Sequence, residues 1–347
     1  MESEDIMGIP ITIVSGFLGS GKTTLINQAL ETAEIPKEEI FIIENEFGET
    51  GMDHELLLHT KEQVLQLNNG CMCCSLRGDL IAALTDIETL TQKWGLPLSQ
   101  IIIETTGIAD PQPIIQTILT TPTLKNRFYI DSLLTVVDIN NVFNYQNEPV
   151  SMKQMMLADR LFLSVKDEGQ ELDVPKVLKQ VGLINPLADQ LFFSHTSPIE
   201  AKSFFKLNKF QSPFTIGETD VGHLELTINE EQETEHVHSR EHHAMHAHNS
   251  HGFEAISLTT EVYLREELLL RWLDWLTDTH QERLYRFKGI IGIQGHELMI
   301  AMQGVNQQVT FSLTPLPCTT TKIILIGKQL DKTAIQKSFD HLCNAYD

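Results

Sequence analysis

Residues 16–24 read GFLGSGKTT and directly follow the apolar run Ile9–Val14. The pattern G-x-x-x-x-G-K-[ST] is filled here by Gly16, Gly21, Lys22 and Thr23. The residues that follow have a helical pattern, so a strand, a glycine-rich loop and a helix succeed one another. Backbone N–H groups then surround a polyphosphate at the N-terminus of the helix. The stretch predicts a phosphate-binding P-loop, in which Lys22 neutralises the β- and γ-phosphates and the Thr23 hydroxyl binds Mg²⁺.

Short β-rich runs alternate with helical patterns from residue 9 to about residue 195. The runs are Ile9–Val14, Ile40–Ile43, Val64–Leu67, Ile101–Glu104, Ser132–Val137, Arg160–Leu163 and Gln190–Phe193. This alternation predicts an α/β fold, a P-loop NTPase domain with a mostly parallel sheet and flanking helices. In such a sheet ligands bind beyond the carboxyl ends of the strands. We expect the ligand crevice where these loops gather: 16–23, 44–51, 70–78, 104–110 and 164–168.

The chain is long enough for two domains. The P-loop domain is expected over 1–210, a linker with a histidine-rich loop over 211–252, and a smaller α+β domain over 253–347. In the last domain strands are expected at Phe253–Leu264, Leu284–Ile293, Glu297–Met302, Val309–Leu313 and Lys322–Ile326, and helices at Arg265–Thr279 and Lys332–Ala345. The helical spacing of Trp272 and Trp275 favours a place in the core. No role can be derived for Arg286 and Lys288.

The composition favours metal cations or basic protein surfaces as partners. The 25 basic and 47 acidic residues give a formal charge of −22, which opposes nonspecific binding to nucleic acid or anionic lipid. There is no run of about 18 apolar residues, and the N-terminus is acidic. We therefore expect neither a membrane span nor a secretory signal, and a cytoplasmic protein. The five cysteines are not spaced as a disulfide framework.

Three thiols lie within four residues, at Cys71, Cys73 and Cys74, directly after the turn signal Asn-Asn-Gly. In an extended segment Cys74 points away from the other two, so the loop must curl for all three to reach one ion. Soft thiolates favour Zn²⁺ or Cu⁺ over Mg²⁺, and an exchangeable position in a tetrahedral site suits metal transfer. A redox thiol and a structural cluster are the alternative interpretations.

Acidic side chains follow two of the predicted strands. Residues 44–49 read ENEFGE, at the place where many P-loop GTPases carry a segment that senses the γ-phosphate. These carboxylates could assist Mg²⁺, complete the thiolate site or only be solvated, and the sequence leaves the three open. The strand Ile101–Glu104 ends in an acid, a position from which a carboxylate reaches the water shell of Mg²⁺. An ordinary polar loop is the alternative there.

Half of the 14 histidines lie in one tract. They are His236, His238, His242, His243, His246, His248 and His251. Neutral imidazoles bind zinc, nickel, copper or cobalt, and an irregular tract supplies several weak, interchangeable sites. Transient metal loading is the functional interpretation, and a solvated loop is the alternative.

Eight segments together resemble the CobW-type metal-chaperone GTPases, and the small bacterial members most closely. The segments are GFLGSGKTT at 16–24, IENEFGE at 43–49, NGCMCC at 69–74, ETTGIADP at 104–111, VVD at 136–138, SVKD at 164–167, RFKG at 286–289 and LIGKQL at 325–330. The resemblance spans almost the whole chain. It implies that the first domain binds and hydrolyses GTP with Mg²⁺, that the C-x-C-C cysteines hold a transition metal, and that nucleotide state is coupled to delivery of that metal to a client protein.

The resemblance also implies roles for single residues. The phosphates and Mg²⁺ are expected on Gly16, Gly19, Ser20, Gly21, Lys22, Thr23 and Thr24, with Glu104 in the Mg²⁺ shell. The transition metal is expected on Cys71, Cys73 and Cys74, with Glu44 and Glu49 as oxygen donors. Asp167 is expected to accept hydrogen bonds from guanine, and Lys166 to lie along the base.

The guanine-specificity motif N-K-x-D departs from its usual form here and reads Ser164-Val165-Lys166-Asp167. If Asp167 reaches the base, GTP is preferred, since a carboxylate accepts from the two donors of guanine and finds no such pair on adenine. Alternatively, the shifted lysine weakens stacking and relaxes this preference.

The sequence as a whole predicts a slow, Mg²⁺-dependent GTPase that acts as a metallochaperone. Its expected partners are GTP, a transition-metal ion (zinc, or else cobalt or nickel) and an unidentified client metalloprotein, without nucleic acid or membrane; a homodimer is left open. No water-positioning residue can be named. Two other functions remain: a metal-buffering or metal-sensing protein in which nucleotide only stabilises the fold, and a P-loop kinase for a small molecule.

Overall fold

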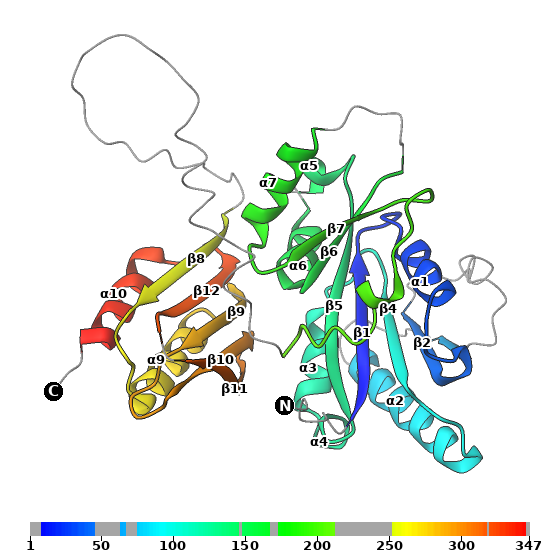
Figure 1. The fold of residues 1–347 in the computed structure, drawn as a ribbon, viewed down its shortest axis with the longest axis horizontal. Helices are drawn as coiled ribbons and strands as arrows, with labels where there is room; N and C mark the ends of the chain where they lie inside the picture. Colours follow the sequence, from blue (N-terminus) through cyan, green and yellow to red (C-terminus); the bar gives the residue numbers. More distant parts are fainter. Residues whose placement is uncertain are drawn as a thin grey trace, which may run out of the picture.

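The computed structural model describes residues 8–45, 63–66, 75–145, 148–166, 173–211, 252–317 and 319–344. Two sheets with their own helices lie beside one another (Figure 1). The first sheet has seven strands and the second has five. The predicted fold class, a P-loop α/β domain followed by a smaller α+β domain, is confirmed.

The strands of the first sheet come from the apolar runs of the sequence. They are β1 (Ile9–Gly16), β2 (Ile40–Asn45), β3 (Gln63–Gln66), β4 (Gln100–Thr105), β5 (Phe128–Asp138), β6 (Arg160–Ser164) and β7 (Asp189–Phe193). Their order is β3-β2-β4-β1-β5-β6-β7, and every pairing is parallel. Ile11, Ile13 and Val14 of β1 are fully buried, because helices cover both faces of a parallel sheet.

Two layers of helices enclose this sheet. They are α1 (Lys22–Glu31), α2 (Ser75–Trp94), α3 (Gln112–Thr120), α4 (Pro122–Lys125), α5 (Val142–Tyr145), α6 (Pro149–Leu157) and α7 (Val174–Ile184), with short turns η1 (Lys37–Glu39) and η3 (Ala201–Ser203). α1 packs with Val14 on one face, and α2 and α3 pack with Ile11 and Ile13 on the other. α6 and α7 continue this second layer over Leu161 and Leu163 of β6. Because all seven strands are parallel, their carboxyl ends lie at one edge of the sheet, where this type of fold binds ligands.

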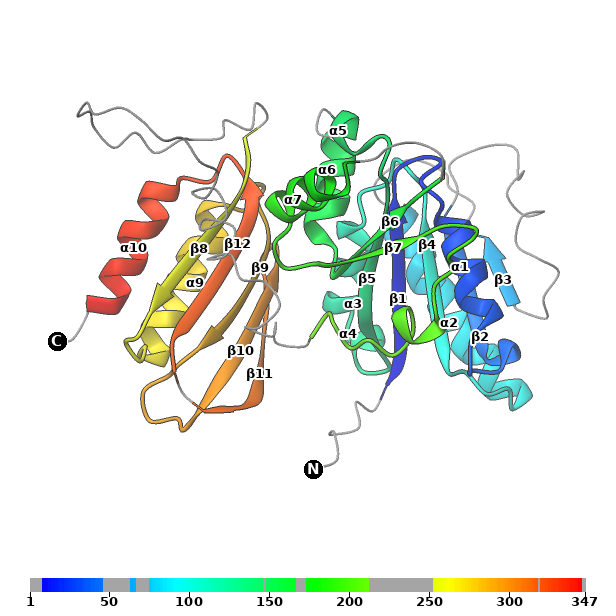
Figure 2. The same ribbon diagram turned by 45° about the horizontal axis from the view of Figure 1, so that its top comes forward.

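The second domain is an antiparallel sheet with helices on one side. Its elements are β8 (Phe253–Thr260), α9 (Glu266–Thr279), β9 (Leu284–Ile291), β10 (Leu298–Val305), β11 (Gln308–Pro317), β12 (Thr321–Lys328) and α10 (Lys332–Asn344), with strand order β11-β10-β9-β12-β8. Figure 2 shows α9 and α10 on the side that faces away from the first domain. Ile324 and Ile326 of β12 instead join an apolar cluster with Met152 of α6 and Val177 of α7. The two domains therefore share buried apolar surface.

Several expectations about the second domain need correction. β8 ends at Thr260 rather than at Leu264, because the Val262 N–H donates to Thr260 Oγ1 (3.1 Å) and turns the chain out of the sheet. β10 extends three residues further than predicted, to Val305, and β11 four residues further, to Pro317. Trp272 lies in the core at 6% exposed, as expected, but Trp275 is 37% exposed, and its expected place in the core is wrong.

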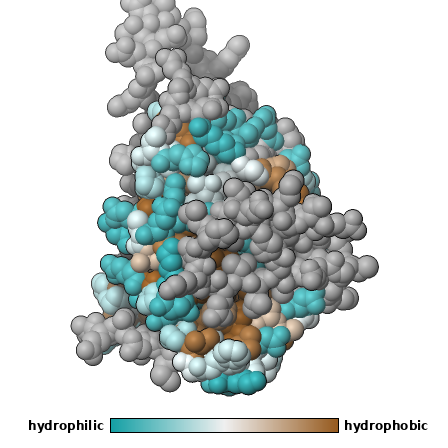
Figure 3. Space-filling model, turned by 90° about the vertical axis from the view of Figure 1, so that its right-hand side faces the viewer, coloured by the Kyte–Doolittle hydropathy of each residue, from teal (hydrophilic) through white to brown (hydrophobic). Residues whose placement is uncertain are grey.

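Hydrophilic residues cover most of the described part of the face in Figure 3, which agrees with the formal charge of −22. Among the helices of the described residues, none combines the length and apolar character that crossing a membrane requires. Residues 212–251, which hold nearly all of the expected linker and histidine tract, lie outside the described residues. The domain boundaries proposed from the sequence stay predictions.

We expect Gly304→Ala to destabilise the second domain. A Cβ atom at Gly304 of β10 would overlap the buried ring of Phe287 on β9, and overpacking of this kind costs about 1–3 kcal/mol. Gly78 of α2 is the matched control, because a Cβ atom there meets nothing within 4 Å and alanine stabilises a helix by about 0.5–1 kcal/mol relative to glycine. Calorimetry should show a lower melting temperature for Gly304→Ala only. Equal effects of the two substitutions would contradict this packing.

Candidate functional site

The P-loop leaves the sheet at a position that accepts only glycine. Gly16, the last residue of β1, has φ of 142°, and a Cβ atom there would overlap the carbonyl oxygen of Val136 on β5. Gly21, with φ of 107°, is the N-cap residue of α1, whose first turn carries no acidic residue. The amide groups of that turn have no partner within the helix, so the end of α1 attracts an anion. The geometry suits a phosphate group.

The side chains of Lys22 and Thr23 contact groups on the P-loop and on β4. Lys22 Nζ donates to the carbonyl oxygens of Gly16 (3.0 Å) and Phe17 (3.3 Å), so the ammonium group lies over the loop. Thr23 Oγ1 donates to Glu104 Oε1 at 3.1 Å. A hydroxyl and a carboxylate at the base of a phosphate loop are hard oxygen donors, which is the ligand type that Mg²⁺ prefers. The residues present therefore fit a bound Mg²⁺.

A second carboxylate lies beside this pair. Glu44 of β2 and Glu104 of β4 are directly opposite one another in the parallel sheet, and residues opposite one another in register extend from the same face. Glu44 is 5% exposed. The strand order therefore brings two carboxylates, Glu44 and Glu104, to the same end of neighbouring strands.

The loop after β4 touches the P-loop directly. A Cβ atom at Gly107 would lie 2.6 Å from Leu18 Cα, so glycine is required where the two backbones meet. Glu104 lies only three positions before Gly107 in the chain. The position of the loop after β4 therefore bears on the surroundings of both the P-loop and Glu104.

Lys166 takes a place that the sequence did not suggest. Its Nζ donates to Asp138 Oδ2 at the end of β5 (2.7 Å) and to the carbonyl oxygen of Gly19. Ser164 stands at the asparagine position of the N-K-x-D motif. Its Oγ atom would lie 3.2 Å from a Cβ atom placed on Gly21. The segment 164–166 is therefore tied to the P-loop. Asp167, the residue expected to read the base, lies outside the described residues.

Other predicted site residues also lie outside the described residues. They are Cys71, Cys73, Cys74, Glu49, His236, His238, His242, His243, His246, His248 and His251. Among the residues that the structure describes, no group of three or more histidine, cysteine, aspartate or glutamate side chains could hold a metal ion. The C-x-C-C and histidine sites remain predictions.

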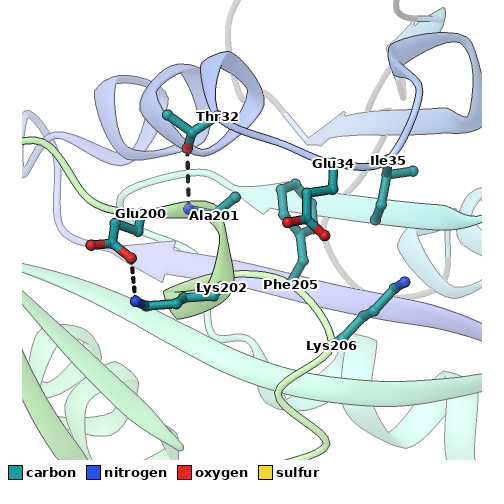
Figure 4. A pocket seen from close by; sticks show the side chains of 8 residues that line it. All are labelled: Thr32, Glu34, Ile35, Glu200, Ala201, Lys202, Phe205 and Lys206. Atoms are coloured by element: carbon teal, nitrogen blue, oxygen red, sulfur yellow. Dashed lines mark hydrogen bonds and ion pairs between the residues drawn. The ribbon is translucent and has the colours of Figure 1, made fainter.

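A cavity of about 530 Å³ lies at the other end of α1 from the P-loop. Figure 4 shows its walls, which come from the end of α1 and from the segment around η3. The lining residues are Thr32, Glu34, Ile35, Glu200, Ala201, Lys202, Phe205 and Lys206. Two of its charged side chains, Glu200 and Lys202, pair with each other. Since α1 spans about 15 Å, this cavity is separate from the phosphate site.

A buried charge cluster between the domains was not predicted. Arg286 and Lys288 of β9 both reach Asp159, which lies two residues after the end of α6. Burial would raise the pKa of Asp159, but the charges of Arg286 and Lys288 hold it below its ordinary value. Burial lowers the pKa of Lys288 to about 8, against the opposing effect of Asp159. The RFKG segment was the only signal in the sequence, and it did not reveal the partner.

Both domains match families of known proteins. Residues 10–192 match the family described as "CobW/HypB/UreG, nucleotide-binding domain", and residues 253–343 match "Cobalamin synthesis protein cobW C-terminal domain". This chain belongs to the CobW/HypB/UreG family. Members of this family include GTPases and zinc chaperones, so the resemblance seen in the sequence is confirmed.

Named relatives cover nearly the whole chain. "Zinc chaperone YjiA" of Escherichia coli is 29% identical over 95% of this chain and 98% of its own length. "Zinc chaperone CobW" of Pseudomonas aeruginosa is 30% identical over 94% of this chain and 89% of its own length. The crystal structure of Zn(II)-bound YjiA GTPase from E. coli shares the fold, with a TM-score of 0.70 and 23% identity over 96% of this chain and 99% of that one.

We expect Gly16→Ala to abolish nucleotide binding. The new methyl group would overlap the backbone of β5 and force the P-loop out of place. Gly95→Ala, directly after α2, is the matched control: a Cβ atom there meets nothing within 4 Å, and its φ of 62° adds a backbone strain of about 1–2 kcal/mol. Calorimetric titration with GDP should show binding by Gly95→Ala and none by Gly16→Ala. Equal affinities would show that the close approach at Gly16 is not needed.

Proposed function

We propose that this protein is a GTP-binding and GTP-hydrolysing metallochaperone. It binds a transition metal, zinc before cobalt or nickel, at the C-x-C-C motif and transfers it to a client metalloprotein. The observation that supports this most directly is the register of β2 and β4, which brings Glu44 beside Glu104 while Glu104 accepts from Thr23 (3.1 Å). The zinc-chaperone names of its relatives support the choice of metal.

In this proposal the residues around the P-loop hold GTP and Mg²⁺. The phosphates lie on the backbone amides of Gly19–Thr24, together with the Lys22 ammonium group, and Gly16 gives the loop its turn. Thr23 and Glu104 would hold Mg²⁺, and the bound ion would neutralise charge on the phosphates. Water attacks the γ-phosphate and GDP and phosphate leave. Asp167 accepts hydrogen bonds from guanine. Lys166 ties segment 164–166 to the P-loop through its hydrogen bond to the carbonyl oxygen of Gly19.

The topology supports a metal site near the nucleotide. Residues 67–74, which contain the three cysteines, lie in the chain between Gln66, the last residue of β3, and Ser75, the first residue of α2. β3 pairs in parallel with β2, so its carboxyl end lies at the same edge of the sheet as Glu44 and the P-loop. We propose that Cys71, Cys73 and Cys74 hold the metal there, with Glu44 and Glu49 as oxygen donors. The seven histidines load it.

Metal affinity then depends on the nucleotide. GTP would order residues 44–51, and loss of the γ-phosphate would change the oxygen donors that these residues offer to the transition metal. By linkage, metal must change nucleotide affinity by the same factor. Hydrolysis gives the transfer its direction. A slow intrinsic rate, raised by the client, follows from the lack of an identifiable water-positioning residue.

Two other functions would give different results. A metal buffer or sensor that uses nucleotide only for stability would keep its metal-dependent phenotypes in Lys22→Ala, whereas the chaperone would lose them. A small-molecule kinase would consume GTP only when an acceptor is added and would leave the phosphoryl group on that acceptor rather than release phosphate. It would also leave the three cysteines without a role.

We expect Thr23→Ala and Glu104→Gln to weaken the Mg²⁺-dependent part of GTP binding. A hydrogen bond or ligand to a charged group is worth about 1.5–3 kcal/mol, so affinity should fall roughly 10- to 100-fold. Calorimetric titration with a non-hydrolysable GTP analogue measures this. The same titrations in EDTA are the control, and there both variants should bind like the wild type. An equal loss in EDTA would mean that these residues do not act through Mg²⁺.

We expect stoichiometric Zn²⁺ to change the affinity for the GTP analogue by about 5- to 150-fold. Cys73→Ala should abolish this change, because it removes a ligand of the proposed metal site. Cys343→Ala is the matched control, since this half-buried thiol lies on α10 of the second domain. Titrations with and without Zn²⁺, together with metal analysis of untagged protein, give the values. Identical nucleotide affinities with and without Zn²⁺ would refute the coupling.

A further inference from the structure

Buried charges hold the second domain against the end of α6. Arg286 of β9 donates to the carbonyl oxygen of Leu157, the last residue of α6, and to Asp159 Oδ1. The side chains of Arg286 and Asp159 are 1% and 0% exposed. Lys288 Nζ lies 3.3 Å from the same carboxylate oxygen and donates to the carbonyl oxygen of Lys209 (2.7 Å). Removal of one partner would leave buried charge uncompensated, so this contact fixes how the domains meet.

The same helix contacts the second domain a second time, through Lys153. Its Nζ lies 5.1 Å from the centre of the Tyr285 ring on β9 and forms an ion pair of 2.5 Å with Asp110 Oδ2 in the loop after β4. Burial, and then the charge of Asp110, raise the pKa of Tyr285. Lys153 therefore links the second domain to the loop after β4.

The next residue of α6 holds the backbone of that loop. Gln154 is completely buried, and its Nε2 donates to the carbonyl oxygens of Ala109 (2.9 Å) and Gly107 (3.3 Å). Thr135 of β5 donates to the Gln154 backbone at 3.0 Å, so α6 is also fixed to the sheet at this residue. Gly107 in turn lies against Leu18 of the P-loop. One turn of α6 thus spans the distance between the second domain and the nucleotide loops.

We propose that α6 couples the second domain to the nucleotide site, with Lys153 and Gln154 as positioning residues for loop 106–111. Docking of β9 on α6 sets the position of this loop against the P-loop, and through it the geometry around Glu104. A change of nucleotide moves the loop and is passed to β9 by the same contacts. The second domain is then a regulatory part of the GTPase. This inference rests on the part of the proposed function that places GTP and GDP at the P-loop.

The test compares Lys153→Met and Lys153→Arg in the full-length chain. Lys153→Met removes both the ion pair with Asp110 and the cation over Tyr285, and it should lower kcat for GTP about 2- to 30-fold, with GDP affinity unchanged. Lys153→Arg keeps a cation at both partners and should restore the rate. Lys179→Met, at an exposed position of α7, makes the same change of charge and should match the wild type.

Hydrogen exchange supplies a readout that does not depend on turnover. In the wild type, exchange at residues 284–288 of β9 should differ between the GDP complex and the complex with a GTP analogue, and Lys153→Met should remove this difference. Arg286→Met should also remove this difference in exchange, provided that circular dichroism shows the variant to be folded. If Arg286→Met does not fold, the comparison of Lys153→Met with Lys153→Arg decides the test.

The outcomes separate the two proposals. If the wild type releases no phosphate from GTP, the proposed function fails, while a nucleotide-dependent exchange at 284–288 that needs Lys153 still supports the coupling. If the wild type hydrolyses GTP and Lys153→Met behaves like Lys179→Met in both rate and exchange, the coupling is overturned and the GTPase stands.

Discussion

The position of β1 between β4 and β5 is the constraint on which the nucleotide site depends. On one side, the carbonyl oxygen of Val136 forces the chain to leave the sheet through Gly16. On the other side, the register with β4 brings Glu104 to the hydroxyl of Thr23. Because all carboxyl ends of a parallel sheet meet at one edge, a single strand placement supplies both the phosphate loop and the oxygen donors for Mg²⁺.

The contact between the domains has a different physical character. Asp159, Arg286 and Lys288 are buried together, although desolvation costs several kcal/mol for each ion. We interpret the cluster as a means of fixing one docking geometry, since apolar side chains would fill the space at lower cost. This geometry matters because α6, the helix that the cluster holds, also carries Gln154 against the loop after β4. The same helix, α6, therefore takes part both in holding the domains together and in the proposed coupling between them.

Much of the fold could be predicted because the strands of the first sheet are buried on both faces and read as continuous apolar runs. The sequence was less informative about strand ends in the second domain, where helices α9 and α10 cover one side of an antiparallel sheet. There the ends of β8, β10 and β11 depend on partners such as Thr260 Oγ1, which bonds the Val262 N–H. Trp275 has the spacing of a core residue and yet is 37% exposed, because periodicity does not show where a layer ends.

The sequence alone determined the P-loop, the parallel domain, the family and the residues proposed as metal ligands. These signals are contiguous, and their chemistry follows from neighbouring residues in one loop. The tertiary structure decided which distant groups act together: Lys153 with Asp110 across 43 residues, and Asp159 with Arg286 across 127. Such pairs arise from strand order and domain docking, which bury one charged or polar group beside another, and no local pattern encodes that choice.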